Sequence, residues 1–268
     1  PVLHLNTIKD TSLWYQLNES FSGVERELAE TIASNLVSIC QDAYDRMKIF
    51  PSLHPEYTLH DALHCLRVTE LMYRVMPESV RSLLNPVEIT LLILSAHFHD
   101  QGMVMGREEL EALHSNAKFK VFEDNWEIEH PNIKEVRQRL GDRNVTGAEK
   151  EHIRETYHEL RAALLTDYVR LTHGERSSQF VKKTYSDDPR WSINETNIAD
   201  LVARLCVSHV RSAVELIPAK GFRHDETVGT YRVNMPYIGL ILRLADILDF
   251  DRDRTPSSLY RTIDFEAK

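Results

Sequence analysis

Residues 91–102 read Leu-Leu-Ile-Leu-Ser-Ala-His-Phe-His-Asp-Gln-Gly, and this segment is apolar on every side for two turns. A helix that is apolar all round runs through a core, so the segment predicts a buried central helix. It ends in His99 and Asp100, and Gly102 stands where a helix would stop. A buried imidazole and carboxylate are costly unless they hydrogen-bond to each other or hold a cation, and the segment alone leaves both interpretations open.

The rest of the chain predicts an all-α fold. Apolar residues recur at three- and four-residue steps, and there are only 9 Gly and 10 Pro in 268 residues. The central helix is expected to begin at Asn85-Pro86, with Asn as the N-cap. Other helices are expected over about 22–47, 58–75, 148–172, 192–209 and 236–249, with a short hairpin within 222–233. The helix over 148–172 is expected to end at His173-Gly174, where another begins.

The composition is typical of a soluble protein with a substantial core. Hydrophobic residues make up 42% of the chain, and the net charge of −9 speaks against a sequence-independent nucleic-acid binder, although not against a local basic cleft. Cys40, Cys65 and Cys206 form no C-x-x-C pair and indicate buried thiols in a reducing compartment. Without a signal-like start or an apolar run near 20 residues, we expect a cytoplasmic protein that does not enter a membrane.

A single domain over residues 1–268 is expected, with its core at about 58–250. The charged and broken segment 103–147 is expected to be a helical insertion with short helices around 107–114 and 132–140, lacking apolar content for a core of its own. Because the chain does not begin with Met and ends in a charged stretch at Lys268, we expect it to be the N-terminal part of a longer protein.

Further His and Asp residues recur on other expected helices at core-facing positions. His64 lies a full turn inside its helix, and His209 extends the apolar stripe of its helix. His173 lies at an expected helix junction, and Asp246 interrupts a run as apolar as residues 91–98. Alone, a residue such as His64 is more often a hydrogen-bonded core histidine. Together, these positions favour a metal site that the fold assembles.

Two other His-Asp pairs are not expected to bind metal. Asp61 of the pair His60-Asp61 is explained by the capping box that begins at Thr58. The pair His224-Asp225 belongs to a polar loop without apolar support.

The order His…His-Asp…His…His…Asp over about residues 58–250 resembles the HD-domain phosphohydrolase superfamily. The motifs that carry the resemblance are His64-x-x-Arg67-Val68, Ala96-x-x-His99-Asp100-x-Gly102 and Leu244-Ala-Asp246-x-Leu248-Asp249. Three further stretches are similar to a branch in which the HD domain precedes a Hsp90-like ATPase domain in a longer bacterial protein. They are Tyr57-Thr-x-His-Asp-x-x-His64, His173-x-x-Arg176-Ser177 and Asp251-Arg-x-Arg254-Thr-Pro256.

The resemblance implies an all-α HD-domain helical bundle with a divalent metal, which could be Mn, Fe, Mg, Ni or Zn. The residues it implies as ligands of a first ion are His64, His99, Asp100 and Asp246. His173 and His209 match the extra histidines of two-metal members, in which Asp100 would bridge both ions. In the one-metal alternative, these two histidines contact a substrate phosphate instead. Met103 and Ser208-His209-Val210 depart from many cyclic-dinucleotide phosphodiesterases of the superfamily, which weakens the transfer of that particular activity.

Three arginines lie one helical turn from a proposed ligand: Arg67, Arg170 and Arg243. This spacing places each guanidinium on the ligand's face of the helix, about 5–6 Å away at the Cβ atoms. The arginines could clamp phosphate groups or pair with a carboxylate such as Asp249, and both interpretations stay open. With Asp100, we predict Arg67 and Arg243 as catalytic residues.

The sequence therefore predicts a metal-dependent phosphohydrolase in which a metal-activated water attacks a nucleotide or another phosphoester. The alternative is a regulatory module that binds metal and nucleotide with little turnover and controls an attached ATPase domain. A metal-dependent nuclease fits the ligands but not the acidic balance, so binding to nucleic acid stays open.

Overall fold

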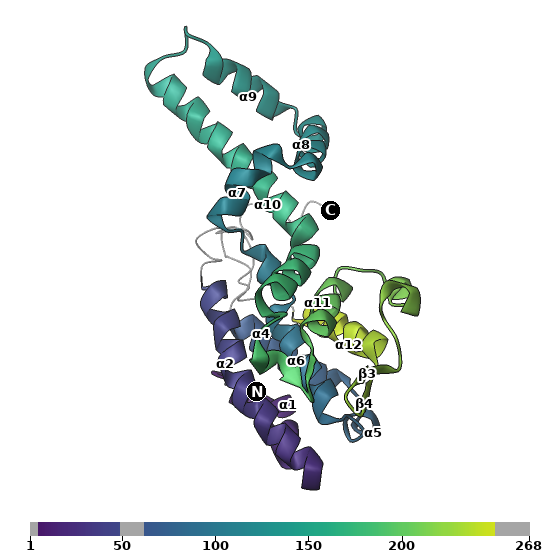
Figure 1. Ribbon diagram of the computed structural model, residues 1–268. Coiled ribbons are helices and arrows are strands. Elements are labelled where there is room, and N and C mark those ends of the chain that lie inside the picture. Colours follow the sequence, from purple (N-terminus) through teal and green to yellow (C-terminus); the bar gives the residue numbers. More distant parts are fainter. Residues whose placement is uncertain (1–4, 49–61, 250–268) are drawn as a thin grey trace. The chain divides into compact units, whose positions relative to one another are not determined.

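The computed structural model describes residues 5–48 and 62–249, which form two compact units (Figure 1). Unit 1 consists of the described residues up to Val104 and those from His173 onward, and unit 2 consists of Met105–Thr172. The all-α prediction is confirmed, because the strands among the described residues form only two short antiparallel pairs. In the same part of the chain, no helix combines the length and apolarity that a membrane span requires.

Unit 1 contains the helices that surround the predicted metal ligands. Its α-helices are α1 (Ser12–Glu19), α2 (Gly23–Met47), α4 (Ala62–Val75), α5 (Glu78–Arg81), α6 (Pro86–Phe98), the part of α10 (Gly147–Tyr185) from His173 onward, α11 (Ala199–Ser208) and α12 (Met235–Leu248). Its 3-10 helices are η1 (Ile8–Asp10), η2 (Gln101–Met103), η4 (Pro189–Trp191), η5 (Ala213–Glu215) and η6 (Pro218–Lys220). The strands are β1 (Ser192–Ile193), β2 (Thr196–Asn197), β3 (Glu226–Val228) and β4 (Tyr231–Val233), of which β3 and β4 form the predicted hairpin.

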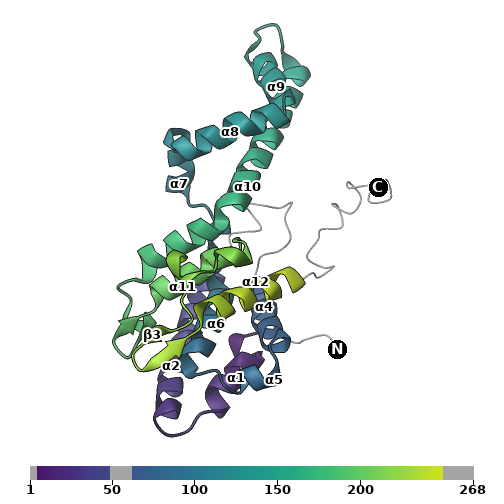
Figure 2. The same cartoon turned by 90° about the vertical axis from the view of Figure 1, so that its right-hand side faces the viewer.

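The central helix of unit 1 is α6, as the apolar segment predicts. Every residue of α6 except Glu88 is buried, and the helix contacts α1, α2, α4, α11 and α12 (Figure 2). Its start is defined by a capping box, in which Asn85 Oδ1 accepts the backbone N–H groups of Val87 and Glu88, both at 3.0 Å. Pro86 occupies the first turn, where its missing N–H leaves no bond unmade. These features place the His99-Asp100 pair at the buried end of a rigid element.

The predicted helix break at His173-Gly174 is wrong. The helix α10 continues through both residues to Tyr185. The absence of a side chain at Gly174 lets Val210 pack directly against α10, because a Cβ there would lie 2.6 Å from Cγ2 of Val210. A glycine can end a helix or admit a neighbour, and only the packing distinguishes the two.

The predicted helix start at Ser192 is also wrong. Asn194 and Glu195 have φ values of 48° and 63°, and they form the turn between β1 and β2. The helix α11 begins only at Ala199. The Ser-x-x-Glu pattern resembles a capping box, but Asn readily adopts the left-handed conformation that a two-residue hairpin turn requires.

Unit 2 contains the expected insertion within a longer segment. Its elements are α7 (Arg107–Ala112), η3 (Leu113–Ser115), α8 (Ala117–Glu129), α9 (Asn132–Gly141) and the part of α10 before His173. The rings of Phe119 and Tyr168 meet edge to face at 4.9 Å, and Trp126 Nε1 donates to Asp167 at 2.9 Å. The aromatic residues of α8 thus bury area against the part of α10 that belongs to unit 2, whose residues Asp167 and Tyr168 lie outside the segment 103–147.

Candidate metal centre

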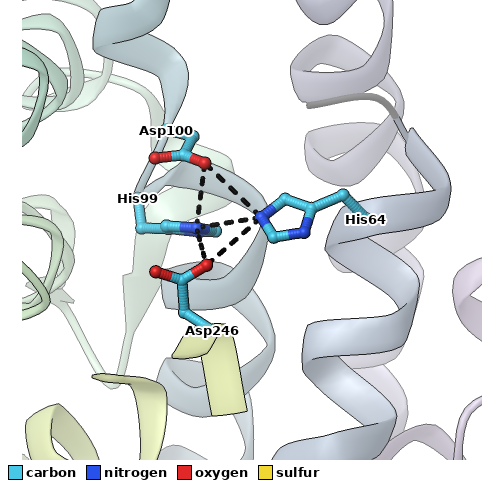
Figure 3. A group of neighbouring side chains, drawn as sticks. All are labelled: His64, His99, Asp100 and Asp246. Atoms are coloured by element: carbon cyan, nitrogen blue, oxygen red, sulfur yellow. Dashed lines mark hydrogen bonds and ion pairs between the residues drawn. The ribbon is translucent and has the colours of Figure 1, made fainter. Parts of the chain in front are cut away.

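Four predicted ligands from three helices of unit 1 meet around one point (Figure 3). His64 comes from α4, Asp246 from α12, and His99 and Asp100 follow the last residue of α6. The two Nε2 atoms of His64 and His99 lie 3.2 Å apart, and Asp100 Oδ2 lies 3.4 Å from the first and 3.2 Å from the second. Asp246 Oδ1 lies 3.6 Å from each of the same nitrogens. We call these four residues the first donor group.

A second donor group lies on the other oxygen of Asp100. His173 Nε2 is 3.4 Å and His209 Nε2 is 3.6 Å from Asp100 Oδ1, and the two nitrogens are 2.8 Å from each other. His173 belongs to α10, and His209 is the C-cap residue that follows Ser208, the last residue of α11. The carboxylate of Asp100 thus divides its two oxygens between two groups of donors, which is the arrangement of a carboxylate that can bridge two ions.

Hydrogen bonds at Nδ1 determine which nitrogen His99 and His209 turn toward the interior of the site. The Nδ1 atom of His99 lies 3.0 Å from the carbonyl oxygen of Ala96, and that of His209 lies 2.5 Å from the carbonyl oxygen of Cys206. Because a carbonyl only accepts, Nδ1 carries the proton in both rings. In the neutral ring, Nε2 then presents its lone pair to the interior of the site.

This donor set fits a cation. Inward lone pairs and carboxylate oxygens repel one another at the observed distances unless a proton or a metal ion lies between them. Mixed imidazole nitrogen and carboxylate oxygen donors suit Zn, Mn, Fe or Ni, and carboxylates also suit Mg. The residues could therefore hold a divalent metal, although their role as ligands stays a prediction.

The pKa values describe the site without a metal. Burial alone would lower the pKa of His99, but the carboxylates of Asp100 and Asp246 outweigh it and raise the pKa well above 6.5. Burial would raise the pKa of Asp246, and the hydrogen bond and charge of His99 hold it below its usual range instead. Without a metal ion, a proton on His99 thus offsets part of the negative charge of Asp100 and Asp246, which a cation would otherwise offset. Burial, with the charge of His99, lowers the pKa of His209 to about 3 and keeps this ring in the neutral form that binds metals.

A serine that sequence reasoning did not assign holds the Asp100 loop against α10. Ser177 Oγ donates to the carbonyl oxygen of His99 at 2.5 Å and accepts from the N–H of Gly102 at 2.7 Å. Because Ser177 lies one turn after His173, these two bonds relate the loop that carries Asp100 to the helix that carries a donor of the second group. The sequence signal was the motif His173-x-x-Arg176-Ser177, which places a hydroxyl one turn after a core-facing histidine without indicating its role.

The reason for Gly102 differs from the one predicted. It does not have the left-handed conformation of a helix-ending glycine, and α6 has already ended at Phe98. A Cβ on Gly102 would overlap the carbonyl oxygen of His173 and lie 2.5 Å from the backbone nitrogen of Ser177. Gly102 is required because the loop passes directly against the backbone of α10.

The two predicted catalytic arginines have different surroundings. Arg67 Nε donates to Asp249 Oδ1 at 2.8 Å. Arg243, three residues before Asp246, is half-buried, and its Nη1 atom is buried without a hydrogen-bond partner among the described residues. Of the pairs not expected to bind metal, His224 and Asp225 are exposed on a loop, and His60 and Asp61 lie outside the described residues.

His97 is a buried histidine beside the centre that no ligand role explains. Its Nδ1 donates to the carbonyl oxygen of Ile93 at 2.8 Å, so its Nε2 accepts from the hydroxyl of Tyr44 at 2.6 Å. Burial lowers the pKa of His97 to about 4, below its ordinary value of 6.5.

We expect His97 to make the protein acid-sensitive. Between the two pKa values the unfolded chain binds more protons than the folded chain, so the free energy of unfolding falls as the pH drops from about 6.5 toward about 4. Replacing His97 by Gln should reduce the loss of stability between about pH 7.5 and about pH 5, measured by urea unfolding of the metal-free protein. An equal loss in the variant and the wild type would contradict this assignment.

Comparison with known families identifies the class of the protein. Residues 54–267 match the HD-CE family, which is a family of HD-type domains. The chain therefore belongs to the HD-CE family. No curated protein and no solved structure matches it.

Proposed function

We propose that the chain is a metal-dependent phosphohydrolase that acts on a nucleotide or another phosphoester. The observation that supports this most is the carboxylate of Asp100, whose two oxygens face two groups of inward-directed donors. A purely structural His–Asp contact needs neither a second histidine pair nor a carboxylate shared between the two groups. Membership of an HD-type family is compatible with this chemistry.

His64, His99, Asp100 and Asp246 would hold the first ion, and Asp100, His173 and His209 the second. A divalent ion at such a site lowers the pKa of a bound water toward about 7 and neutralises phosphoryl oxygens. Asp246 is 27% exposed, whereas the side chains of His64 and His99 are fully buried. The phosphoester would therefore approach from the side of Asp246.

Arg243 would contact the substrate. It lies one turn before Asp246 on α12, and its Nη1 is a buried donor without a protein acceptor among the described residues. An unsatisfied buried donor is costly, and a phosphoryl oxygen would satisfy it with a charge-assisted hydrogen bond.

Two ions, rather than one, are the expected stoichiometry. Replacing His173 by Ala should lower the manganese content from two ions per chain toward one, because the first donor group remains complete. Equilibrium dialysis with elemental analysis measures this, and His224→Ala is the matched control because His224 is exposed and far from any donor group in sequence. A single ion in both the wild type and His173→Ala would contradict the two-ion site and favour an enzyme with one metal ion.

A substrate screen tests the proposed activity. The purified chain, loaded separately with Mn, Zn, Ni, Fe and Mg, is assayed for hydrolysis of nucleotides, cyclic nucleotides and simple phosphoesters, and the products are separated by chromatography because a cyclic nucleotide opens to a monophosphate without releasing phosphate. Metal-dependent turnover that Asp246→Ala abolishes is the expected result. Metal and nucleotide binding without turnover would instead favour the regulatory module, whose attached ATPase domain remains a prediction.

A further inference from the structure

We propose that Asp249 is a positioning residue, which together with Arg67 orients His64 toward the metal. This inference rests on the proposed metal centre and extends it by one layer of side chains. Asp249 is the C-cap residue of α12, one residue after Leu248 and three residues after Asp246. Its side chain is 3% exposed, so its carboxylate is among the buried charges of unit 1.

Each oxygen of Asp249 has a different partner. Oδ2 accepts from His64 Nδ1 at 2.7 Å, and Oδ1 accepts from Arg67 Nε at 2.8 Å. His64 and Arg67 lie one turn apart on α4, so a single carboxylate from α12 binds two successive positions of one helix face. The backbone N–H of Asp249 also donates to the carbonyl oxygens of Ala245 and Asp246, at 3.0 and 3.2 Å, which anchors the carboxylate to the helix that carries a predicted ligand.

The contact determines the state of His64. An ionised carboxylate only accepts, so Nδ1 of His64 carries the proton and the lone pair of Nε2 faces His99, Asp100 and Asp246. The other histidines of the donor groups for which the structure gives an Nδ1 partner, His99 and His209, use backbone carbonyls for this purpose. Among these three histidines, His64 is the one whose Nδ1 partner is a replaceable side chain.

Arg67 has a distinct task in this arrangement. A buried carboxylate without a cation is costly, and the Nε bond to Arg67 offsets the charge of Asp249 without withdrawing it from His64. The arrangement accounts for an arginine one turn from a proposed ligand without requiring it to bind substrate. Arg243, with its unpartnered Nη1, keeps the substrate role.

Metal affinity tests the proposal, with a chelator-buffered zinc titration as the measurement. Asp249→Asn should weaken zinc binding about 10- to 100-fold, since partners of metal-ligating histidines typically have effects of this size. Asp225→Asn is the matched control, because it makes the same chemical change at an exposed site and should leave the affinity unchanged. In a His64→Ala background, Asp249→Asn should cause no further loss, since Asp249 acts through His64.

Arg67→Met tests the same contact by changing Arg67, whose side chain is less buried than that of Asp249. This variant is the alternative if the Asp249 variant does not fold. It should weaken zinc binding, and its effect should not add to that of Asp249→Asn. In zinc-loaded protein, the Nδ1–H proton of His64 should give a hydrogen-bonded imidazole resonance in the NMR spectrum, which Asp249→Asn shifts and His64→Ala removes.

Three outcomes would overturn the inference. They are wild-type zinc affinity in Asp249→Asn, full additivity in the His64→Ala background, or an Arg67→Met variant that loses only hydrolysis while it keeps its zinc affinity. None of these outcomes would contradict the proposed phosphohydrolase, which fails separately if the zinc- or manganese-loaded wild type hydrolyses no phosphoester in the substrate screen. A wild type that binds no metal would refute both proposals.

Discussion

Replacing Asp100 by alanine is expected to abolish metal binding at both positions and to lower phosphoester hydrolysis by at least about 10³-fold. The reason is that its Oδ2 lies with the first donor group and its Oδ1 with the second, so one substitution removes a ligand from each. The substitution also removes a negative charge, the same charge that raises the pKa of His99. The remaining donors of both groups therefore attract a cation less strongly.

Elemental analysis after dialysis against manganese measures the first effect, and the initial rate on the best substrate measures the second. Asp225→Ala is the control, because this carboxylate is exposed and pairs only with Arg223 among the described residues. Asp100→Asn refines the result, since an amide keeps the shape and loses the charge. Equal metal content in wild type and Asp100→Ala would refute the metal centre.

Replacing Gly102 by alanine should destabilise the protein by about 3 kcal/mol or more and disturb the metal centre. The new Cβ would overlap the carbonyl oxygen of His173 and press on the backbone of Ser177 at 2.5 Å and on Cβ of Arg176 at 2.8 Å. Backbone atoms cannot rotate away as a flexible side chain can, so the loop has to leave α10 and lose both bonds of Ser177. Asp100, two residues earlier, would move with it.

Thermal unfolding of the metal-free variant should show a midpoint lowered by roughly 6–12 °C, and metal content should fall in parallel. Gly106→Ala is the matched control, because Gly106 has an ordinary φ of −72° and open space around its Cβ position. Its stability should stay within about 0.5 kcal/mol of the wild type. A Gly102→Ala variant as stable as the control would show that the loop does not depend on this close approach.

Helices with a clear apolar periodicity and a clear capping residue could be predicted from the sequence. Helix ends marked by a residue that has more than one possible role, such as glycine, could not. The start of α6 follows from Asn85-Pro86, since capping is decided by neighbours in the sequence. The continuity of α10 through Gly174 and the turn at Asn194 could not be predicted, because Val210 and the pairing of β1 with β2 decide them from elsewhere in the chain. The helix α8 was missed although Phe119, Phe122 and Trp126 have helical spacing, because its many charged residues concealed the pattern.

The sequence by itself determined the all-α class, the buried central helix and the set of side chains able to bind a metal. These depend on periodicity and residue type, which are local properties of the chain. Only the tertiary structure decided that Asp100 divides its oxygens between two donor groups, that Asp249 and Arg67 support His64, and that Ser177 and Gly102 hold the loop against α10. Each of these contacts joins residues more than 70 positions apart or depends on a ring nitrogen's direction, and no local pattern records which distant partner a buried polar group will find.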